Sequence, residues 1–315
     1  MRPALAGAKG RSMADAPTFT IFVPTFNRGY CIEDALQSCE RSTFRDLEIV
    51  LVDDGSTDDT ASRVEAMRSR MSLPLRYEYQ ENQGKHVAFN RAVQLAKGTL
   101  FVTLDSDDRL LPDGLQQIDE LWRCIPQSTR AFFAGVEFRC LEDGVPSSAY
   151  PEPYVDCHYM EKAALGPSHG EKRYAYRLDV LKEYPYPVFE GERYCRPGLI
   201  DMRISKRYMI RLSNIVAIDA GHYADGIGAN RRRIIASAPK AYRQYFLEAI
   251  TEHAQYLEKS ALRSYYRRYS RSSFNARVGA RAQLSEVPDK WRLLALLPET
   301  YLSSALDRLR WHRSR

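Results

Sequence analysis

The chain has 315 residues, of which 44% are hydrophobic, and this composition excludes a disordered polypeptide. The net charge of +6 is unevenly spread, because residues 231–315 hold 18 Lys and Arg against 7 Asp and Glu, a net of +11 that leaves −5 for residues 1–230. An acidic front part and a basic end exclude one uniform nucleic-acid-binding surface.

The first half of the chain alternates strand-like and helix-like segments. Apolar or alternating runs predict strands at 19–24, 47–54, 75–80 and 99–104. Helical spacing predicts helices at 32–42, from Ser56 onward, at 84–98 and at 113–125. We expect Ser56 to be an N-cap with Asp58 and Asp59 in the first turn, and Gly98 to end the third helix. This alternation predicts an α/β fold with parallel crossovers.

The second half has a different pattern. Residues from about 142 to 187 are rich in Pro, Tyr and Gly, which predicts long loops with short elements. After about Pro239 the pattern is helical, basic and rich in Tyr. The six scattered cysteines form no C-x-x-C pair and indicate reduced thiols. No apolar run approaches the roughly 18 residues of a membrane span, and the N-terminus has no apolar segment of the kind found in secretory signals.

Polar motifs follow three of the predicted strands: PTFNRG, DDGSTDD and DSDD. Ligands of open α/β sheets bind at the carboxyl ends of the strands, so we expect these motifs to converge. Asp105 and Asp107 could hold Mg²⁺ or Mn²⁺, which prefer carboxylate oxygens; the alternative is a solvated turn with Asp108 capping the next helix. Asp53 and Asp54 could accept hydrogen bonds from a base or a ribose, or form a cap-and-turn cluster.

Several other nucleotide and metal motifs do not fit. An EF-hand loop starting at Asp105 fails at Arg109, Leu110 and Gln116, and a phosphatase-type D-x-D-x-[TV] motif fails at Arg109. No G-x-G-x-x-G follows either of the first two strands, and no P-loop sequence occurs. These absences argue against a nicotinamide site and a P-loop nucleotidase.

Taken in order, the segments IFVPTFNRG, DLEIVLVDDGSTDDT and ENQGKHVAFNRAVQLAKGTLFVTLDSDDRLLPDGL resemble the nucleotide-binding half of family 2 glycosyltransferases with the GT-A fold. This resemblance covers roughly residues 18–125. The segment YPYPVFEGERYCRPGLIDMRISKRY (184–208) resembles the acceptor side of members that build bacterial surface polysaccharides. The resemblance implies a Rossmann-like, mostly parallel mixed sheet flanked by helices.

The resemblance also implies a division of the chain. A flexible N-terminus would span 1–17, and a GT-A catalytic domain 18–235. Within that domain, 18–125 would bind the nucleotide-sugar and 126–235 the acceptor. A basic helical extension would follow at 236–315.

The resemblance gives donor-binding roles to the first loop and the Asp pair. The base and ribose pocket would be lined by Pro24, Thr25, Asn27 and Arg28. Asp54 would pair with the uracil edge of UDP, and Asp53 would support it. Lys85 would lie near the base or the phosphates, since helix N-termini favour anions; the alternative is a solvated lysine.

The resemblance places a metal and the transferred sugar at DSDD. Asp105 would touch the ribose or the sugar, with Ser106 beside it in the donor site. Asp107 would ligate Mn²⁺ or Mg²⁺, and Asp105 is a second candidate ligand. His222 or Asp225, in GHYADGIG, could touch the metal or the diphosphate, although a lone His is more often structural.

Family members of this kind invert the anomeric centre, so one carboxylate must take the proton of the acceptor hydroxyl. The matching stretch here is FEGERYCRP. We expect Glu192 to be this base, with Glu190 as the second candidate. The alternative is that both are surface acids, because no Glu-Asp pair is present.

The expected function is therefore metal-dependent, inverting transfer of a sugar, from a UDP-sugar, to a hydroxyl of a surface glycan or a lipid-linked acceptor. Alternatives are a sugar-phosphate nucleotidyltransferase, for which PTFNRG lacks a Gly- and Arg-rich phosphate loop, and a non-catalytic nucleotide-sugar-binding module. We expect a cytoplasmic protein with no nucleic-acid partner. Its basic, aromatic C-terminal part could lie on the cytoplasmic face of an anionic membrane, or pack on the catalytic domain with a solvated basic face.

Overall fold

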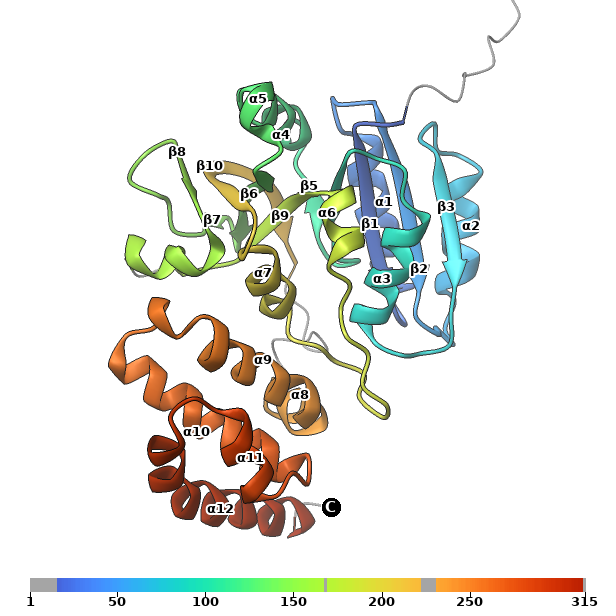
Figure 1. The fold of residues 1–315 in the computed structure, drawn as a ribbon. Helices are drawn as coiled ribbons and strands as arrows, with labels where there is room; N and C mark the ends of the chain where they lie inside the picture. Colours follow the sequence, from blue (N-terminus) through green and yellow to red (C-terminus); the bar gives the residue numbers. More distant parts are fainter. Residues whose placement is uncertain (1–15, 167–168, 222–230, 314–315) are drawn as a thin grey trace, which may run out of the picture.

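The computed structural model describes residues 16–166, 169–221 and 231–313. Strands and helices alternate in its N-terminal part (Figure 1). These elements are β1 (Phe19–Thr25), α1 (Ile32–Glu40), β2 (Leu47–Asp53), α2 (Thr60–Arg68), β3 (Leu75–Tyr79), α3 (Lys85–Leu95) and β4 (Leu100–Thr103). β1 pairs in parallel with β2 and β4, and β2 pairs in parallel with β3. The four predicted strands and their parallel crossovers are confirmed.

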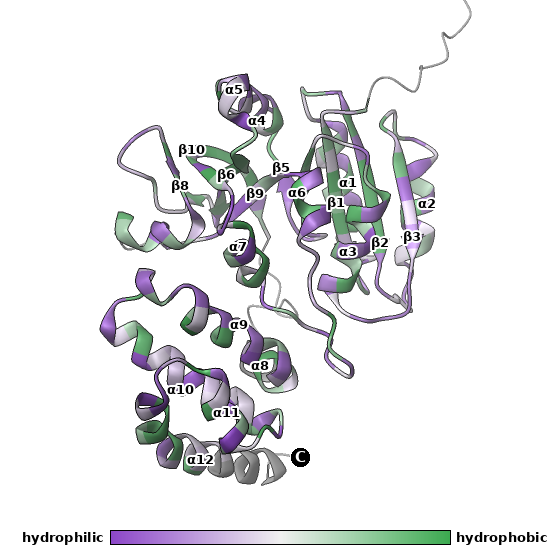
Figure 2. Ribbon diagram, viewed as in Figure 1, coloured by the Kyte–Doolittle hydropathy of each residue, from purple (hydrophilic) through white to green (hydrophobic). Residues whose placement is uncertain are grey.

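The sheet is buried between two layers of helices. Ile21 and Val23 of β1 pack on the side of α1 and α2, whereas Phe22 packs on the side of α3. This two-sided burial explains why β1 and β2 are hydrophobic along most of their length, as Figure 2 shows. The apolar pattern of the sequence was sufficient to locate these strands.

The start of α2 differs from the prediction. The helix begins at Thr60 after Asp59, so Ser56 as its N-cap was wrong. The backbone N–H of Ser56 donates to Asp53 Oδ1 over 2.8 Å, and Ser56 Oγ accepts from the backbone N–H of Asn27 over 2.8 Å. Ser56 therefore joins the loops after β1 and β2 instead of capping a helix.

The middle of the chain widens the sheet. Its elements are β5 (Arg109–Leu110), α4 (Gly114–Arg123), α5 (Gln127–Arg130), β6 (Phe133–Glu142), β7 (Val145–Pro146), β8 (Tyr154–Cys157), the 3₁₀ helix η1 (Tyr159–Leu165), β9 (Lys172–Arg177), α6 (Leu178–Glu183), α7 (Gly198–Ile204) and β10 (Met209–Ala220). The strand order is β3-β2-β1-β4-β9-β6-β10-β5, with β7 beside β6 and β8 beside β10. β9, from the region predicted as loops with short elements, runs antiparallel between β4 and β6.

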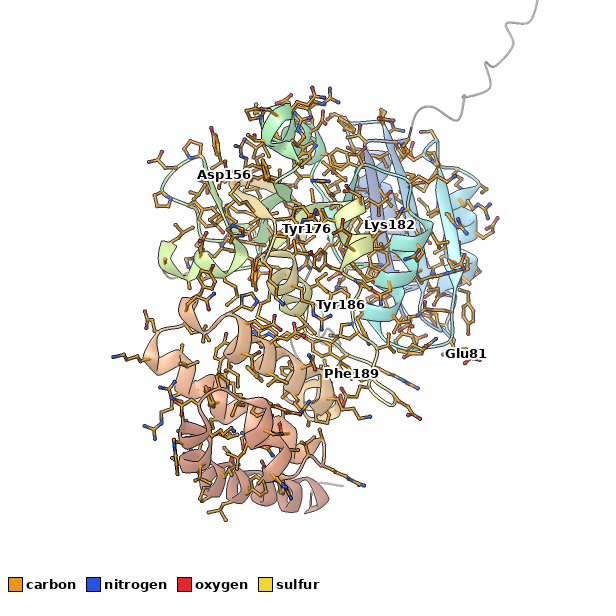
Figure 3. The ribbon with its side chains drawn as sticks, in the orientation of Figure 1. Glu81, Asp156, Tyr176, Lys182, Tyr186 and Phe189 are labelled. Carbon is orange, nitrogen blue, oxygen red and sulfur yellow. The ribbon has the colours of Figure 1, made fainter. Side chains whose placement is uncertain are left out.

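The C-terminal part of the described chain is helical, as predicted. It contains α8 (Arg231–Ser237), α9 (Pro239–Glu252), the 3₁₀ helix η2 (Ala254–Tyr256), α10 (Lys259–Asn275), α11 (Ala280–Glu286) and α12 (Lys290–Arg313). Tyr245 and Phe246 of α9 share a core with Leu199 and Met202 of α7. Figure 3 shows Tyr186 and Phe189 where the sheet meets these helices. Within the described residues, no helix has the length and apolar character needed to cross a membrane.

Candidate active site

The candidate site lies where the strand order reverses. β2 and β3 extend to one side of β1, and β4 lies on the other. Such a switch point opens a crevice at the carboxyl ends of the strands. There the backbone N–H of Asp54 donates to the Thr25 carbonyl over 2.8 Å, and that of Thr57 donates to Asn27 Oδ1 over 2.8 Å. The structure therefore brings together the loops that follow β1 and β2.

The residues after β1 that were predicted to bind the donor have different local environments. Pro24 and Thr25 are buried at the end of β1, and Thr25 Oγ1 has no hydrogen-bond partner among the described residues. Asn27 has a positive φ of 52°. The Arg28 guanidinium lies 5.6 Å from the centre of the exposed Tyr30 ring. The donor roles of these residues remain predictions.

Asp53 and Asp54 are both buried and use their oxygens within the protein. Asp53 Oδ2 accepts from the Tyr77 hydroxyl over 2.8 Å. Asp54 accepts from the side-chain amide of Gln80 and from the backbone N–H groups of Gln83 and Gly84, over 2.7, 2.9 and 2.8 Å. Asp54 thereby anchors the loop that leads into α3. Its contact with a uracil edge stays a prediction.

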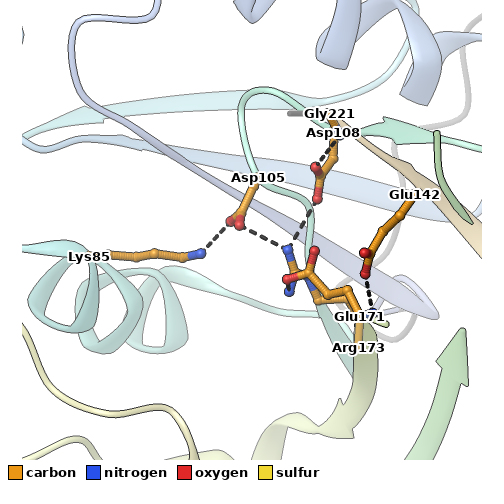
Figure 4. Close-up of polar contacts among 7 residues, drawn as sticks. All are labelled: Lys85, Asp105, Asp108, Glu142, Glu171, Arg173 and Gly221. Carbon is orange, nitrogen blue, oxygen red and sulfur yellow. Dashed lines mark hydrogen bonds and ion pairs between the residues drawn. The ribbon is translucent and has the colours of Figure 1, made fainter. Parts of the chain in front are cut away.

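Two basic side chains form ion pairs with the closely spaced acids that follow β4 (Figure 4). Lys85 Nζ lies 2.5 Å from Asp105 Oδ1. The Arg173 guanidinium lies 3.0 Å from Asp105 Oδ2 and 3.3 Å from Asp108 Oδ2. Asp108 also accepts from the backbone N–H of Gly221 over 3.0 Å. Asp108 is thus not a solvated helix cap, and α4 begins after Asp113 instead.

The three carboxylates have different pKa values. Burial would raise the pKa of Asp105, but Lys85 and Arg173 lower it to about 2. Burial, with the charge of Asp105, raises the pKa of Asp108 to about 7. The same two causes also raise the pKa of Asp107. The cluster therefore combines one firmly ionised carboxylate with two that bind protons more readily.

Asp107 is the carboxylate best placed to take an added cation. It is half-buried, and its carboxylate accepts from its own backbone N–H but is joined by no hydrogen bond or ion pair to another described residue. Both oxygens of Asp105 already form ion pairs with Lys85 and Arg173. A role for Asp105 as a metal ligand remains a prediction. Among the described residues, no three His, Cys, Asp or Glu side chains form a metal site. His222 and Asp225 lie outside the described residues, and Ser106 is buried between the two acids.

The segment between α6 and α7 packs across the start of α3. Tyr186 and Asn90 exchange two hydrogen bonds, of 2.8 and 2.9 Å. Gly84 has a φ of +98°, and a Cβ there would lie 2.0 Å from the Arg193 carbonyl oxygen. His86 is buried beside Tyr186, and neither ring nitrogen has a partner among the described residues. The loop before α3 and the segment 184–208 are thus in direct contact.

The two candidate bases in this segment have different surroundings. Glu192 is buried, and its two oxygens accept from the backbone N–H groups of Lys240 and Ala241 over 2.7 and 2.9 Å. Burial raises its pKa, while these amides, at the start of α9, oppose the rise. Glu190 is exposed. Neither base role is tested by this arrangement, but it gives Glu192 a structural task that the sequence did not suggest.

Two charged groups, one in the site and one on α7, were missed by sequence reasoning. Arg173 lies 65 residues from Asp108 along the chain, and only the pairing of β9 with β4 brings them together. Asp201 of α7 accepts from the Tyr176 hydroxyl over 2.7 Å, and burial raises its pKa to about 7. An isolated Arg in a strand and an Asp in a helix gave no sequence signal.

Comparison with known proteins agrees with this geometry. Residues 20–123 match the family described as Glycosyl transferase family 2. One relative is a GalNAc(5)-diNAcBac-PP-undecaprenol beta-1,3-glucosyltransferase of Campylobacter jejuni, 36% identical over 105 residues, which are 32% of this chain and 33% of that protein. Another is a PGL/p-HBAD biosynthesis glycosyltransferase of Mycobacterium tuberculosis, 39% identical over 95 residues, 30% of this chain and 37% of that protein. The chain thus spans about a third of the length of the curated relatives it matches.

Solved structures share the fold over most of the chain. TarS 1-349 of S. aureus, in complex with UDP-GlcNAc, has a TM-score of 0.60 and 21% identity, covering 89% of this chain and 84% of that one. The mannosyltransferase PcManGT of Pyrobaculum calidifontis, in complex with GDP-Man and Mn²⁺, has a TM-score of 0.55 and 20% identity, covering 93% and 88%. The predicted GT-A fold is confirmed.

Proposed function

We propose that this chain, whose residues 20–123 belong to glycosyl transferase family 2, transfers a sugar from a nucleotide-sugar to an acceptor hydroxyl. The observation that carries the proposal is the acidic cluster at the sheet switch point, where Asp105 is held by Lys85 and Arg173 while the Asp107 carboxylate pairs with no other described residue. An ionised, fixed carboxylate beside an available one suits a site that takes a diphosphate and a cation.

The donor is a UDP-sugar in this proposal. In it, the nucleotide lies at the loops after β1 and β2; Asp53 holds the loop after β2 through Ser56, and Asp54 holds the loop before α3 through Gly84. TarS binds UDP-GlcNAc and the archaeal mannosyltransferase binds GDP-Man, so the shared fold accepts more than one base. The preference for uracil rests on the sequence resemblance.

Asp107 would hold Mn²⁺ or Mg²⁺ in the reacting enzyme. A single protein carboxylate is a common arrangement for such ions when phosphate oxygens and water supply the other ligands. When bound, the cation would neutralise charge on the leaving diphosphate. Lys85 also lies at the start of α3, where its charge and the helix N-terminus favour an anion.

The transfer would proceed with inversion. A new bond forms between the acceptor oxygen and the anomeric carbon, the bond from that carbon to the diphosphate oxygen breaks, and the proton moves from the acceptor hydroxyl to a carboxylate. Glu192 is our first candidate for this base and Glu190 the second. Both candidates need to be tested, because the two oxygens of Glu192 already accept hydrogen bonds from backbone amides.

The acceptor in this proposal is a surface glycan or a lipid-linked glycan at the cytoplasmic face of a membrane. The Campylobacter jejuni relative is named for an undecaprenol-linked acceptor. The segment 184–208, which resembles the acceptor side of polysaccharide-building members, contacts the donor-side loop at Gly84. This contact would let the two substrates meet.

Release of nucleoside diphosphate tests the proposal directly. The full chain is incubated with a panel of nucleotide-sugars and Mn²⁺, and UDP or GDP is measured. We expect slow donor hydrolysis that Asp107→Asn abolishes and that Glu65→Gln, an exposed acid on α2, leaves intact. Pyrophosphate release from UTP and a sugar phosphate would favour a nucleotidyltransferase instead, and tight UDP binding without turnover on any acceptor would favour a binding module.

A further inference from the structure

Helix α12 presents apolar side chains on two opposite faces. Leu293, Leu296 and Thr300 are buried on the side that packs against α10 and α11. On the outer side Trp291 is 81% exposed, Leu302 65% and Leu294 45%. A surface helix normally carries polar residues on the side away from the core.

The outer residues form one continuous stripe. At 3.6 residues per turn, positions 291, 294, 295, 298 and 302 fall on the same side of the helix. They are Trp, Leu, Ala, Pro and Leu, and all five are exposed. We call these residues the α12 outer face. A contiguous exposed apolar patch of this kind marks an interaction site.

The positive charge of the surrounding helices favours an anionic membrane over a second copy of the chain as the partner. Residues 231–315 carry a net charge of +11. Within 236–304 the exposed acids are Glu252, Glu258, Glu286 and Glu299, and the exposed basic residues are more numerous: Lys240, Lys259, Arg263, Arg267, Arg268, Arg271, Arg277, Arg281 and Lys290. Lys290 begins α12 directly before Trp291, and Arg267 of α10 lies 2.9 Å from Glu299 of α12, so basic side chains border the helix, one of them in an ion pair. A second copy would bring an equally basic surface against this one, whereas an anionic bilayer complements it.

We propose that the α12 outer face docks the protein on an anionic phospholipid bilayer. Trp291 would sit at the headgroup level, Leu294 and Leu302 would enter the acyl boundary, and the flanking Arg and Lys would meet lipid phosphates. α12 is the C-terminal helix farthest from the sheet (Figure 1), which leaves its outer side free to meet a membrane. The docking inference rests on the proposed function in one respect only, which is that a lipid-linked acceptor would give the docked enzyme a substrate at the membrane.

Vesicle sedimentation of the full chain tests the docking. Sucrose-loaded vesicles of phosphatidylcholine with roughly 30 mol% of the anionic lipid phosphatidylglycerol, which attracts basic segments, are compared with pure phosphatidylcholine. We expect binding to the anionic vesicles that weakens at high salt. The double variant Trp291→Ser/Leu302→Ser should bind about tenfold more weakly or worse, given the apolar area removed.

The matched control is Phe132→Ser/Val145→Ser, which removes two side chains of similar exposure, 59% and 65%, from the sheet part of the protein. It should bind vesicles like the parent. Both double variants should keep their melting temperature and donor hydrolysis, so a failed docking test is distinct from a failed transfer test. Equal vesicle binding by the α12 variant would overturn the proposal. So would light scattering that shows a dimer dissociating in the α12 variant, because the face would then join two copies.

Discussion

Arg173 Nη2 lies 3.0 Å from Asp105 Oδ2. Arg173 belongs to β9 and Asp105 follows β4, and these strands are antiparallel neighbours with Val102 opposite Ala175. Because β9 runs toward the opposite end, its first residues lie beside the last residues of β4. The acids that follow β4 therefore meet a fixed cation supplied by the sheet itself.

Replacing Arg173 should strongly destabilise the protein. Arg173→Met leaves Asp105 and the buried Asp108 without the guanidinium between them, and breaking such a pair costs about 3 kcal/mol. The free energy of unfolding from urea titration measures this loss. Arg91→Met, which breaks an exposed pair with Glu78, should change it little. Equal effects of the two variants would contradict a special role for Arg173.

Unfolding should depend on pH through Asp201. Its pKa is raised to about 7 in the folded protein and is near 4 when unfolded, so the folded state holds the extra proton between these values. Stability should therefore fall as pH rises from about 4 to 7, by at most about 1.4 kcal/mol for each unit. Asp201→Asn keeps an oxygen for the Tyr176 hydroxyl and has no charge to bury. A fall of the same size in this variant, by denaturant titration at pH 5 and 8, would contradict the assignment.

Gly84→Ala should push the loop before α3 away from the segment 184–208. The added Cβ would lie 2.0 Å from the Arg193 carbonyl oxygen, so we expect a loss of about 2 kcal/mol from the clash. Weaker UDP binding should accompany it. The control is Gly144→Ala, which also has a positive φ but nothing within 4 Å of its Cβ, and isolates the backbone cost of about 1 kcal/mol. Calorimetry of unfolding and UDP titration together check the difference.

Glu192→Gln and Glu190→Gln should separate a base from a helix cap. Glu192→Gln keeps one oxygen for the amides of Lys240 and Ala241 but loses the charge that favours the start of α9, so stability should fall by about 1 kcal/mol. Glu190→Gln should not alter stability, because Glu190 is exposed. Acceptor-dependent turnover then identifies the base as the variant that loses it. If both retain full turnover, neither is the base.

The candidate site could be predicted in part. The loops PTFNRG, DDGSTDD and DSDD were expected to converge, because parallel strands bring their carboxyl ends to one edge, and the structure joins the first two through Asn27 and Ser56. Ser56 as a helix cap was wrong, because a bond between loops competed with a local one. Lys85 was expected near the base or the phosphates of the donor, and its contact with Asp105 came only from the structure.

By itself, the sequence determined the alternation of strands and helices over residues 19–123. Hydrophobic periodicity is a local property, and strands buried on both faces display it plainly. The tertiary structure alone decided that β9 enters between β4 and β6, that Arg173 meets Asp105, and that Glu192 holds the start of α9. Arg173 and Asp105 are 68 positions apart in the chain, and Glu192 and Lys240 are 48 positions apart. The existence of these contacts depends on strand order and helix packing, for which short sequence patterns carry no signal.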